Sequence, residues 1–159
     1  MNNITVSGKA CVFKKKYAKK VALKVLELMG QPDCLDVAIE FVTEDEIQRL
    51  NREIRNIDKV TDVLSFPSTE IKAGEILDVE NEDLMFLVGE NGCVHFGDMA
   101  LCLAQCKRQA KEYGVSLKSE IKKLVIHSML HLMGYDHIKD DDYEIMNKKE
   151  IELDKKITL

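Results

Sequence analysis

Residues 127–137 read His-Ser-Met-Leu-His-Leu-Met-Gly-Tyr-Asp-His and contain three of the four histidines in the 159-residue chain. Apolar residues recur at three- and four-residue intervals just before this stretch, for example at Ile121 and Val125, which predicts a helix that continues into it. Gly134 favours the left-handed backbone that ends a helix and reverses the chain. The stretch therefore predicts a helix over about 117–133 followed by a turn.

The spacing of these histidines predicts a metal site. Positions i and i+4 of a helix share one face, so His127 and His131 point the same way. The turn after Gly134 allows His137 to approach the same ion from outside the helix. Imidazoles bind zinc at ~2.0–2.1 Å, and three protein ligands leave a fourth position for water. We therefore predict one Zn²⁺ ion held by three histidines and a water molecule.

A metal of this kind is expected to be catalytic. Structural zinc sites mostly have four ligands and are rich in cysteine, and no cysteine lies near the three histidines in sequence. Zinc can lower the pKa of a bound water from 15.7 to roughly 7, which suits hydrolysis at neutral pH. The sequence therefore favours a metal-dependent hydrolase.

Two alternatives remain open. A metallopeptidase of the H-E-x-x-H type has a glutamate base directly after the first histidine, and this chain has Ser128 there. That class of enzyme would therefore lack its main proton acceptor. The other alternative is a non-catalytic ribosome-assembly factor, in which Asp136 or a distant cysteine supplies a fourth ligand and the metal only stabilises the fold.

The composition is typical of a globular protein, which we expect to form one domain over residues 1–159. No apolar run approaches the ~18 residues of a membrane helix. The N-terminal residues lack the basic-then-apolar pattern of a secretory signal. Five cysteines without a CxxC pair fit a reducing compartment. We therefore expect a cytoplasmic protein with no membrane partner.

The formal net charge is −5, whereas proteins with a broad nucleic-acid footprint are usually basic. Binding to RNA would therefore need a local basic patch, or a partner such as a ribosomal particle. Residues 14–29 form an amphipathic helical pattern that carries six lysines (Lys14, Lys15, Lys16, Lys19, Lys20 and Lys24). These lysines either contact phosphates or form a solvated face.

The remaining sequence predicts strands that alternate with helices. The expected extended segments are 4–6, 10–13, 35–42, 61–67 and a hairpin of 84–88 with 93–102, and the expected helices are 14–29, 43–55, 103–113, 117–133 and 140–157. Residues 68–83 are acidic and predict a surface loop. The order predicts an α/β (α+β) fold, with a small mixed sheet of four to five strands, about five helices and the metal-binding helix in the C-terminal half.

The chain resembles the YbeY family of bacterial endoribonucleases. The stretches that carry the resemblance are HSMLHLMGYDH at 127–137, TDVLSFP at 61–67, GDMALC at 97–102 and LNREIR at 50–55. The resemblance implies a compact single domain with one zinc ion. It also implies a single-strand-specific endoribonuclease in ribosomal RNA maturation, including 16S rRNA 3′-end processing, and in ribosome quality control. The expected partners are single-stranded ribosomal RNA precursors and ribosomal subunits or proteins.

The resemblance also implies the site residues. It makes His127, His131 and His137 both metal ligands and catalytic residues, and it adds a functional arginine at the end of the second helix, where Arg55 stands. A guanidinium there can pair with a phosphate and stabilise charge that develops on it. Without the resemblance, Arg55 is an ordinary solvent-facing residue at a helix end.

Three further residues lie close to these motifs. Asp136 either accepts a hydrogen bond from an imidazole or fills a turn position. Asp98 either orients a histidine or a water molecule, or caps a turn. His95 lies on an arm of the predicted hairpin and is not expected to bind the metal.

Overall fold

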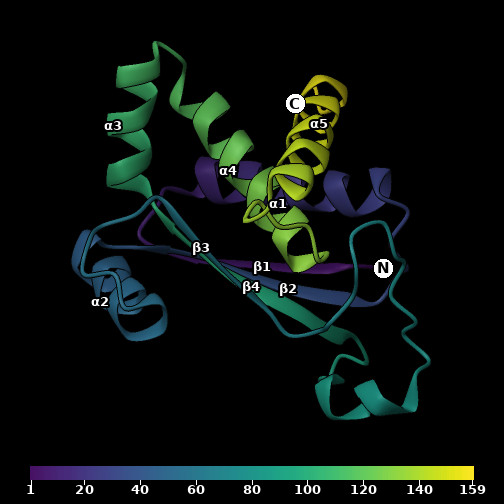
Figure 1. Ribbon diagram of the computed structural model, residues 1–159. Helices are drawn as coiled ribbons and strands as arrows, with labels where there is room; N and C mark the ends of the chain where they lie inside the picture. Colours follow the sequence, from purple (N-terminus) through teal and green to yellow (C-terminus); the bar gives the residue numbers. More distant parts are fainter.

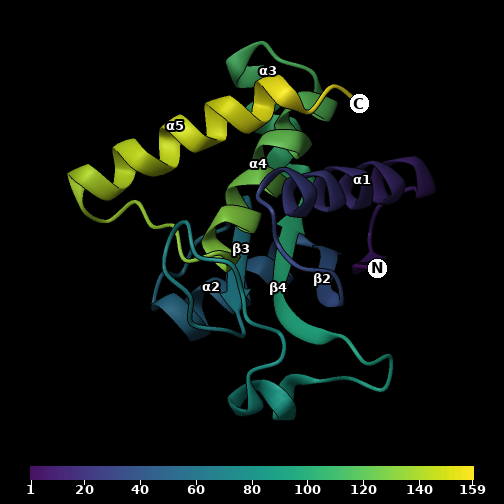
Figure 2. The same cartoon turned by 90° about the vertical axis from the view of Figure 1, so that its right-hand side faces the viewer.

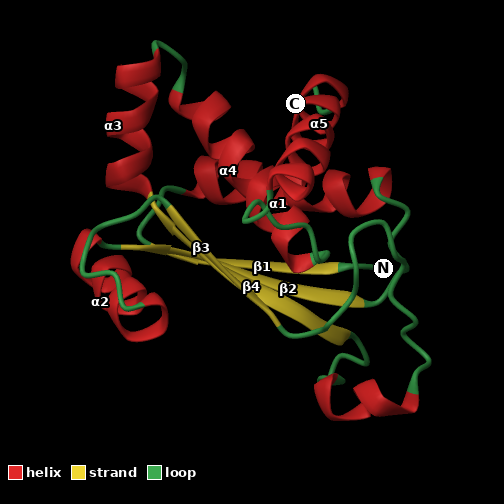
Figure 3. Cartoon of the chain, viewed as in Figure 1, coloured by secondary structure: helices red, strands yellow, loops and turns green.

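A computed structural model describes all residues, 1–159. Its elements are β1 (Asn3–Gly8), α1 (Val12–Leu28), β2 (Leu35–Val42), α2 (Glu44–Arg55), β3 (Val63–Pro67), the 3-10 helix η1 (Glu82–Leu87), β4 (Val94–Cys102), α3 (Leu103–Tyr113), α4 (Leu117–Leu132) and α5 (Asp140–Lys156). Figure 3 shows one sheet surrounded by these helices. The predicted α/β fold, a small mixed sheet packed with about five helices, is confirmed.

The sheet has the strand order β1-β2-β4-β3. The first three strands are mutually parallel, and β3 pairs with β4 in the antiparallel sense. Parallel neighbours need a crossover connection, and α1 provides it between β1 and β2. The two edges of the sheet are therefore β1, next to α1, and β3, which contacts α4.

Helices cover both faces of the sheet (Figure 1). Successive residues of a strand point to opposite faces, so Val63 joins the main core with α1 and α4, whereas Leu64 joins a smaller core with α2. Helix α5 packs against α4 on the side away from the sheet (Figure 2). Because α4 is enclosed by neighbours, apolar residues occupy most of its circumference. None of the helices combines the length and the hydropathy that spanning a bilayer requires.

The predicted starts of the helices 43–55 and 117–133 are confirmed, and a side chain caps each helix. The Thr43 side chain accepts a hydrogen bond from the Glu46 amide at 3.3 Å, and Ser116 accepts one from the Ser119 amide at 3.0 Å. Each bond satisfies an amide that the first turn of a helix leaves without a partner. Helix α4, which carries two of the three clustered histidines, therefore begins where its sequence indicates.

Two expectations about strands were wrong. Residues 10–13 are not an extended segment, because the β1–β2 ladder ends at the pair Gly8 and Phe41 and no strand lies opposite the residues beyond it. Residues 84–88 do not form a hairpin arm, and only Val88 pairs with β4, through an antiparallel bridge to Val94. Residues 84–87 belong to η1, which begins where the Asn81 side chain accepts a hydrogen bond from the Asp83 amide.

Candidate metal centre

The C-terminal end of α4 brings the three histidines together. The amide of Tyr135 donates to the carbonyl of Leu130, and the amide of Gly134 donates to the carbonyl of His131, both at 3.0 Å. These two bonds form a Schellman motif, which requires a left-handed residue such as Gly134, with φ 84°. The chain therefore turns back directly after the helix and returns His137 towards the two helical histidines.

The three imidazole rings converge on one point. The ring centroids of His127 and His131 are 4.6 Å apart, and the His137 ring lies 4.9 Å from His131 and 5.5 Å from His127. Three ring nitrogens, one from each histidine, all lie within 4.8 Å of one another. The convergence predicted from the H-x3-H-x5-H spacing is confirmed.

Hydrogen bonds determine which ring nitrogen of His127 and of His131 can bind a metal ion. His127 Nδ1 is bonded to the Glu150 carboxylate, and His131 Nδ1 is bonded to the Tyr135 carbonyl at 2.9 Å. A backbone carbonyl and an ionised carboxylate can accept a hydrogen bond but cannot donate one. In each ring, therefore, Nδ1 carries the proton. The two Nε2 atoms, which face each other at 3.1 Å, are then the acceptor nitrogens.

This arrangement fits a metal ion. Two facing Nε2 atoms without protons repel each other unless a cation lies between them. Two nitrogens bound at ~2.0–2.1 Å to a tetrahedral ion lie roughly 3.3–3.4 Å apart, which is close to the 3.1 Å between the Nε2 atoms of His127 and His131. The donor set of three imidazoles suits zinc and several other transition metals.

The protonation of His131 supports the same interpretation. Burial, followed by the charges of His127 and His137, lowers the pKa of the His131 imidazole to about 4. A metal ligand must be a neutral imidazole. His131 is therefore in its ligand form at neutral pH.

The three histidines line an open cleft of about 420 Å³. Residues from the end of α2, from β3 and from the segment after α4 line it (Ile54, Arg55, Val63, Leu64, Ser65, Phe66, Pro67, His127, His131, Gly134, Tyr135, Asp136, His137 and Ile138). The tertiary structure thus places Arg55 in the same cleft as the three histidines. Arg55 is exposed and forms no ion pair, whereas Arg52 on the same helix pairs with Asp58 at 3.3 Å.

The residue after the first histidine has a structural contact. Ser128 is fully buried, and its hydroxyl is 2.7 Å from the hydroxyl of Ser65 on β3. This hydrogen bond joins α4 to the edge strand beside the cleft. Ser128 therefore faces the sheet, and its hydroxyl is engaged there.

The other candidate residues have local roles. The Asp136 carboxylate accepts a hydrogen bond from the His137 amide at 2.7 Å, so it holds the turn. Asp98 is bonded to His95 Nε2 at 2.9 Å and so orients a histidine, but one outside the cluster. His95 is not among the clustered histidines, as expected. No cysteine lines the cleft.

Glu150 is the contact that the sequence did not reveal. It lies on α5, 23 residues after His127, and its carboxylate accepts the Nδ1 proton of that histidine. A carboxylate in this position fixes the ring orientation and makes the ligand more basic. Glu150 is one of several acidic residues on α5, and only the packing of α5 on α4 distinguishes it from them.

We expect Glu150→Gln to weaken zinc binding by about tenfold, within the 10- to 100-fold range seen when partners of ligand histidines are altered. The amide can still accept the Nδ1 proton, but it lacks the negative charge. The measurement is competition for zinc with a chromophoric chelator. Glu144→Gln makes the same charge change at an exposed position of α5 without an ion pair and should leave the affinity unchanged. Equal affinities of the two variants would contradict this role for Glu150.

Comparison with known proteins gives a consistent result. Residues 3–158 match the family model described as Endoribonuclease YbeY. A protein named Endoribonuclease YbeY from Clostridium acetobutylicum is 43% identical over 129 residues, which is 78% of this chain and 76% of that protein. Another of that name from Caldicellulosiruptor bescii is 36% identical over 135 residues, or 85% and 81% of the two chains. The solution structure of TM1509 from Thermotoga maritima aligns with a TM-score of 0.60 at 25% identity and covers 96% of this chain and 87% of that one.

Proposed function

This chain belongs to the YbeY endoribonuclease family, and from that premise we propose that it is a single-strand-specific, metal-dependent endoribonuclease. Its substrates would be ribosomal RNA precursors, in 16S rRNA 3′-end processing and ribosome quality control. One observation carries the proposal: an unpaired arginine, Arg55, shares an open cleft with three converging imidazoles. A phosphodiester can then contact a guanidinium and a metal centre at the same time.

His127, His131 and His137 would hold one zinc ion. When bound, the ion supplies a Lewis acid for the phosphate and lowers the pKa of water near it. The Glu150 carboxylate and the Tyr135 carbonyl hold the protons on Nδ1 of two ligands, so that their Nε2 atoms stay directed at the ion. The rings therefore need little reorganisation when metal binds.

Arg55 would bind the phosphate. A guanidinium can donate two parallel hydrogen bonds to phosphate oxygens, and this pairing stabilises negative charge that increases during cleavage. Because no carboxylate pairs with Arg55, a phosphate has no internal competitor for it. The wall of the cleft that contains Phe66 and Pro67 can contact unstacked bases, which favours a flexible single strand over a duplex.

The two alternative functions have less support. A metallopeptidase would need a general base near the metal, but Ser128 is buried against Ser65, and Glu150 binds the Nδ1 side of His127. A non-catalytic zinc protein would need a fourth protein ligand. Asp136 already accepts the His137 amide, and no cysteine lines the cleft.

The proposal also includes the cellular setting. We place the enzyme in the cytoplasm, with ribosomal subunits or proteins as partners beside the RNA and without a membrane partner. The five cysteines are all free thiols, which supports a reducing compartment.

The proposal is tested by cleavage of RNA by the zinc-loaded protein and by Arg55 variants. The wild type is expected to cut a single-stranded RNA and to leave a duplex of the same sequence intact. Arg55→Ala should lower kcat by about 100- to 1000-fold, the usual effect of removing one donor to a developing oxyanion. Arg55→Lys keeps the charge but cannot donate two parallel hydrogen bonds, so its kcat should lie between those of the wild type and Arg55→Ala.

Arg52→Ala is the matched control, since it removes an arginine of the same helix that lies outside the cleft. Its activity should stay within about threefold of the wild type, as expected for an exposed ion pair. If Arg55→Ala cut as fast as the wild type, Arg55 would have no part in the reaction. If the zinc-loaded protein degraded unfolded casein and left RNA intact, the function would be that of a peptidase.

A further inference from the structure

A second groove, of about 650 Å³, lies between α1 and the N-terminal part of α4. Nine residues line it (Phe13, Lys14, Lys16, Tyr17, Lys20, Leu117, Lys118, Ile121 and Leu159), and we call it the α1 groove. Helix α1 contacts β1, whereas the histidines lie beside β3, at the opposite edge of the sheet. Leu117 and His131 are also separated by roughly 21 Å along α4, at ~1.5 Å per residue. The α1 groove is therefore separate from the metal cleft.

The α1 groove concentrates positive charge on an acidic protein. Four of its nine residues are lysines, and none of the four forms an ion pair with a carboxylate. An adjoining groove of about 350 Å³ along β1 shares Lys16 and adds Lys15 and Lys19. Six lysines without carboxylate partners thus line two adjoining grooves, although the net charge of the chain is −5. Asp154 of α5 is paired with Lys122 at 2.8 Å.

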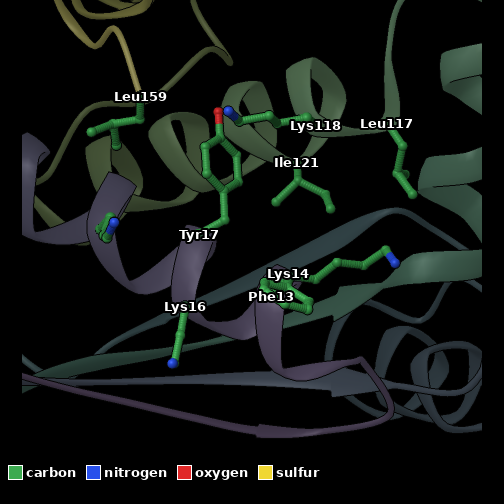
Figure 4. Close-up of a pocket in the computed structure, with 9 residues that line it drawn as sticks. Phe13, Lys14, Lys16, Tyr17, Leu117, Lys118, Ile121 and Leu159 are labelled. Carbon is green, nitrogen blue, oxygen red and sulfur yellow. The ribbon is translucent and has the colours of Figure 1, made fainter.

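Aromatic rings lie among these lysines. The Phe13 side chain is 84% exposed, and Tyr17 rises from α1 towards α4 with the Lys118 amine close to its ring (Figure 4). The Lys118 nitrogen is 4.8 Å from the ring centroid, which is within cation–π range. Leu117 and Ile121 on α4 provide an apolar wall. Rings that any base can stack on, surrounded by cations that any phosphate can pair with, are the usual components of a sequence-tolerant single-strand site.

We propose that the α1 groove anchors a single-stranded segment of the RNA substrate at a distance from the bond that is cut. This inference rests on the proposed function, and it explains how an acidic protein obtains affinity for a polyanion. The charge complementarity favours RNA, and the exposed ring of Phe13 and the stacked pair of Tyr17 and Lys118 favour bases over carboxylate side chains. The alternative ligand of the groove is an acidic protein segment, and the experiment distinguishes it from RNA.

The test compares two triple variants with equal changes of charge. One removes lysines of the α1 groove (Lys16→Gln, Lys20→Gln and Lys118→Gln), and the control removes exposed, unpaired lysines elsewhere (Lys107→Gln, Lys111→Gln and Lys148→Gln). Both are made with His131→Ala, so that RNA is not cut during binding. The probe is a single-stranded RNA of about forty nucleotides, longer than the about 4–16 nucleotides that one single-strand site covers.

The groove variant should bind the long RNA at least tenfold more weakly than its parent, and the control should stay within about twofold. For single strands the slope of log K against log salt is about −0.7 per phosphate contact, so removing three contacts should make it shallower by about 2. Phe13→Ala should weaken binding by about fivefold or more, through the loss of stacking on one base. Equal affinities of the groove and control variants would overturn the proposal.

Two further measurements separate this proposal from the function on which it rests. With His131 restored, the groove variant should cut an RNA of about six nucleotides as fast as the wild type, because such an RNA occupies only the cleft. Slow cutting of the short RNA would show that the groove is not a separate site. If the wild type cut no RNA, the proposed function would fail, while weaker binding of the long RNA by the groove variant would still support the anchor. Unchanged RNA binding with lost binding of a poly-glutamate peptide would assign the groove to an acidic protein.

Discussion

Replacing His131 by alanine is expected to abolish zinc binding and RNA cleavage together. The His131 Nε2 atom lies 3.1 Å from its counterpart on His127, at the centre of the cluster, so its loss leaves two separated ligands. A catalytic metal contributes several kcal/mol of charge stabilisation, which corresponds to a fall in rate of about 1000-fold or more. Zinc per chain is measured by elemental analysis and cleavage with a single-stranded RNA.

His95→Ala is the control for this prediction. It removes a half-buried histidine that is also bonded to a carboxylate, Asp98, but lies outside the cluster. This variant should retain one zinc ion per chain and wild-type cleavage. If His131→Ala kept both its zinc and its activity, the three-histidine site would not be the metal centre. If it lost zinc and unfolded completely, the metal would be structural, as in the non-catalytic alternative.

Gly134→Ala should have the second-largest effect, on stability as well as on metal binding. Gly134 has φ 84°, and a Cβ atom at this position would lie 1.9 Å from the carbonyl oxygen of Ile71. The left-handed backbone alone costs about 1–2 kcal/mol for alanine, and the contact with Ile71 forces a backbone shift. We expect a loss of about 3 kcal/mol or more, and a fall in Tm of roughly 6–12 °C at about 2–4 °C per kcal/mol.

The same substitution should weaken zinc binding, because the turn that shifts carries His137. Gly114→Ala is the matched control: Gly114 caps α3 with φ 65°, and nothing lies within 4 Å of its added Cβ. It has the same backbone strain without the collision, so it should cost about 1–2 kcal/mol and leave zinc affinity unchanged. Equal losses of stability in thermal unfolding of the two variants would show that the contact with Ile71 is unimportant.

The contact between Gly134 and Ile71 changes the interpretation of the acidic stretch 68–83. The sequence predicts a surface loop there, and most of the stretch has no regular secondary structure. Its backbone nevertheless packs directly against the turn that presents His137, and Leu77 within it is buried. The loop therefore supports the turn that carries His137, through the contact of Ile71 with Gly134.

Local features were predictable because they depend on neighbours in the chain. The caps at Thr43 and Ser116, the helix end at Gly134 and the convergence of three histidines all follow from side chains within a few residues of one another. Helix geometry alone places positions i and i+4 on one face. The resemblance to a known family indicated Arg55, which the pattern of the sequence does not distinguish from other residues at helix ends.

The error at residues 84–88 is local, because the chain enters η1 after Asn81 and only Val88 bridges to β4, at Val94. The omissions involve partners that are distant in the sequence. Glu150 is one acidic residue among several until α5 packs on α4 and brings it to His127. The α1 groove likewise exists only where α1 meets α4.

By itself, the sequence determined where the five α-helices lie to within about two residues and that His127, His131 and His137 can share one ion. The tertiary structure alone decided that Arg55 lines the same cleft and that Glu150 binds His127. It also decided that Lys118 of α4 joins the lysines of α1 along one groove. The physical reason is range. Capping and helical periodicity act within one or two turns, whereas the packing of α4 between the sheet, α1 and α5 is a collective outcome of burying one core.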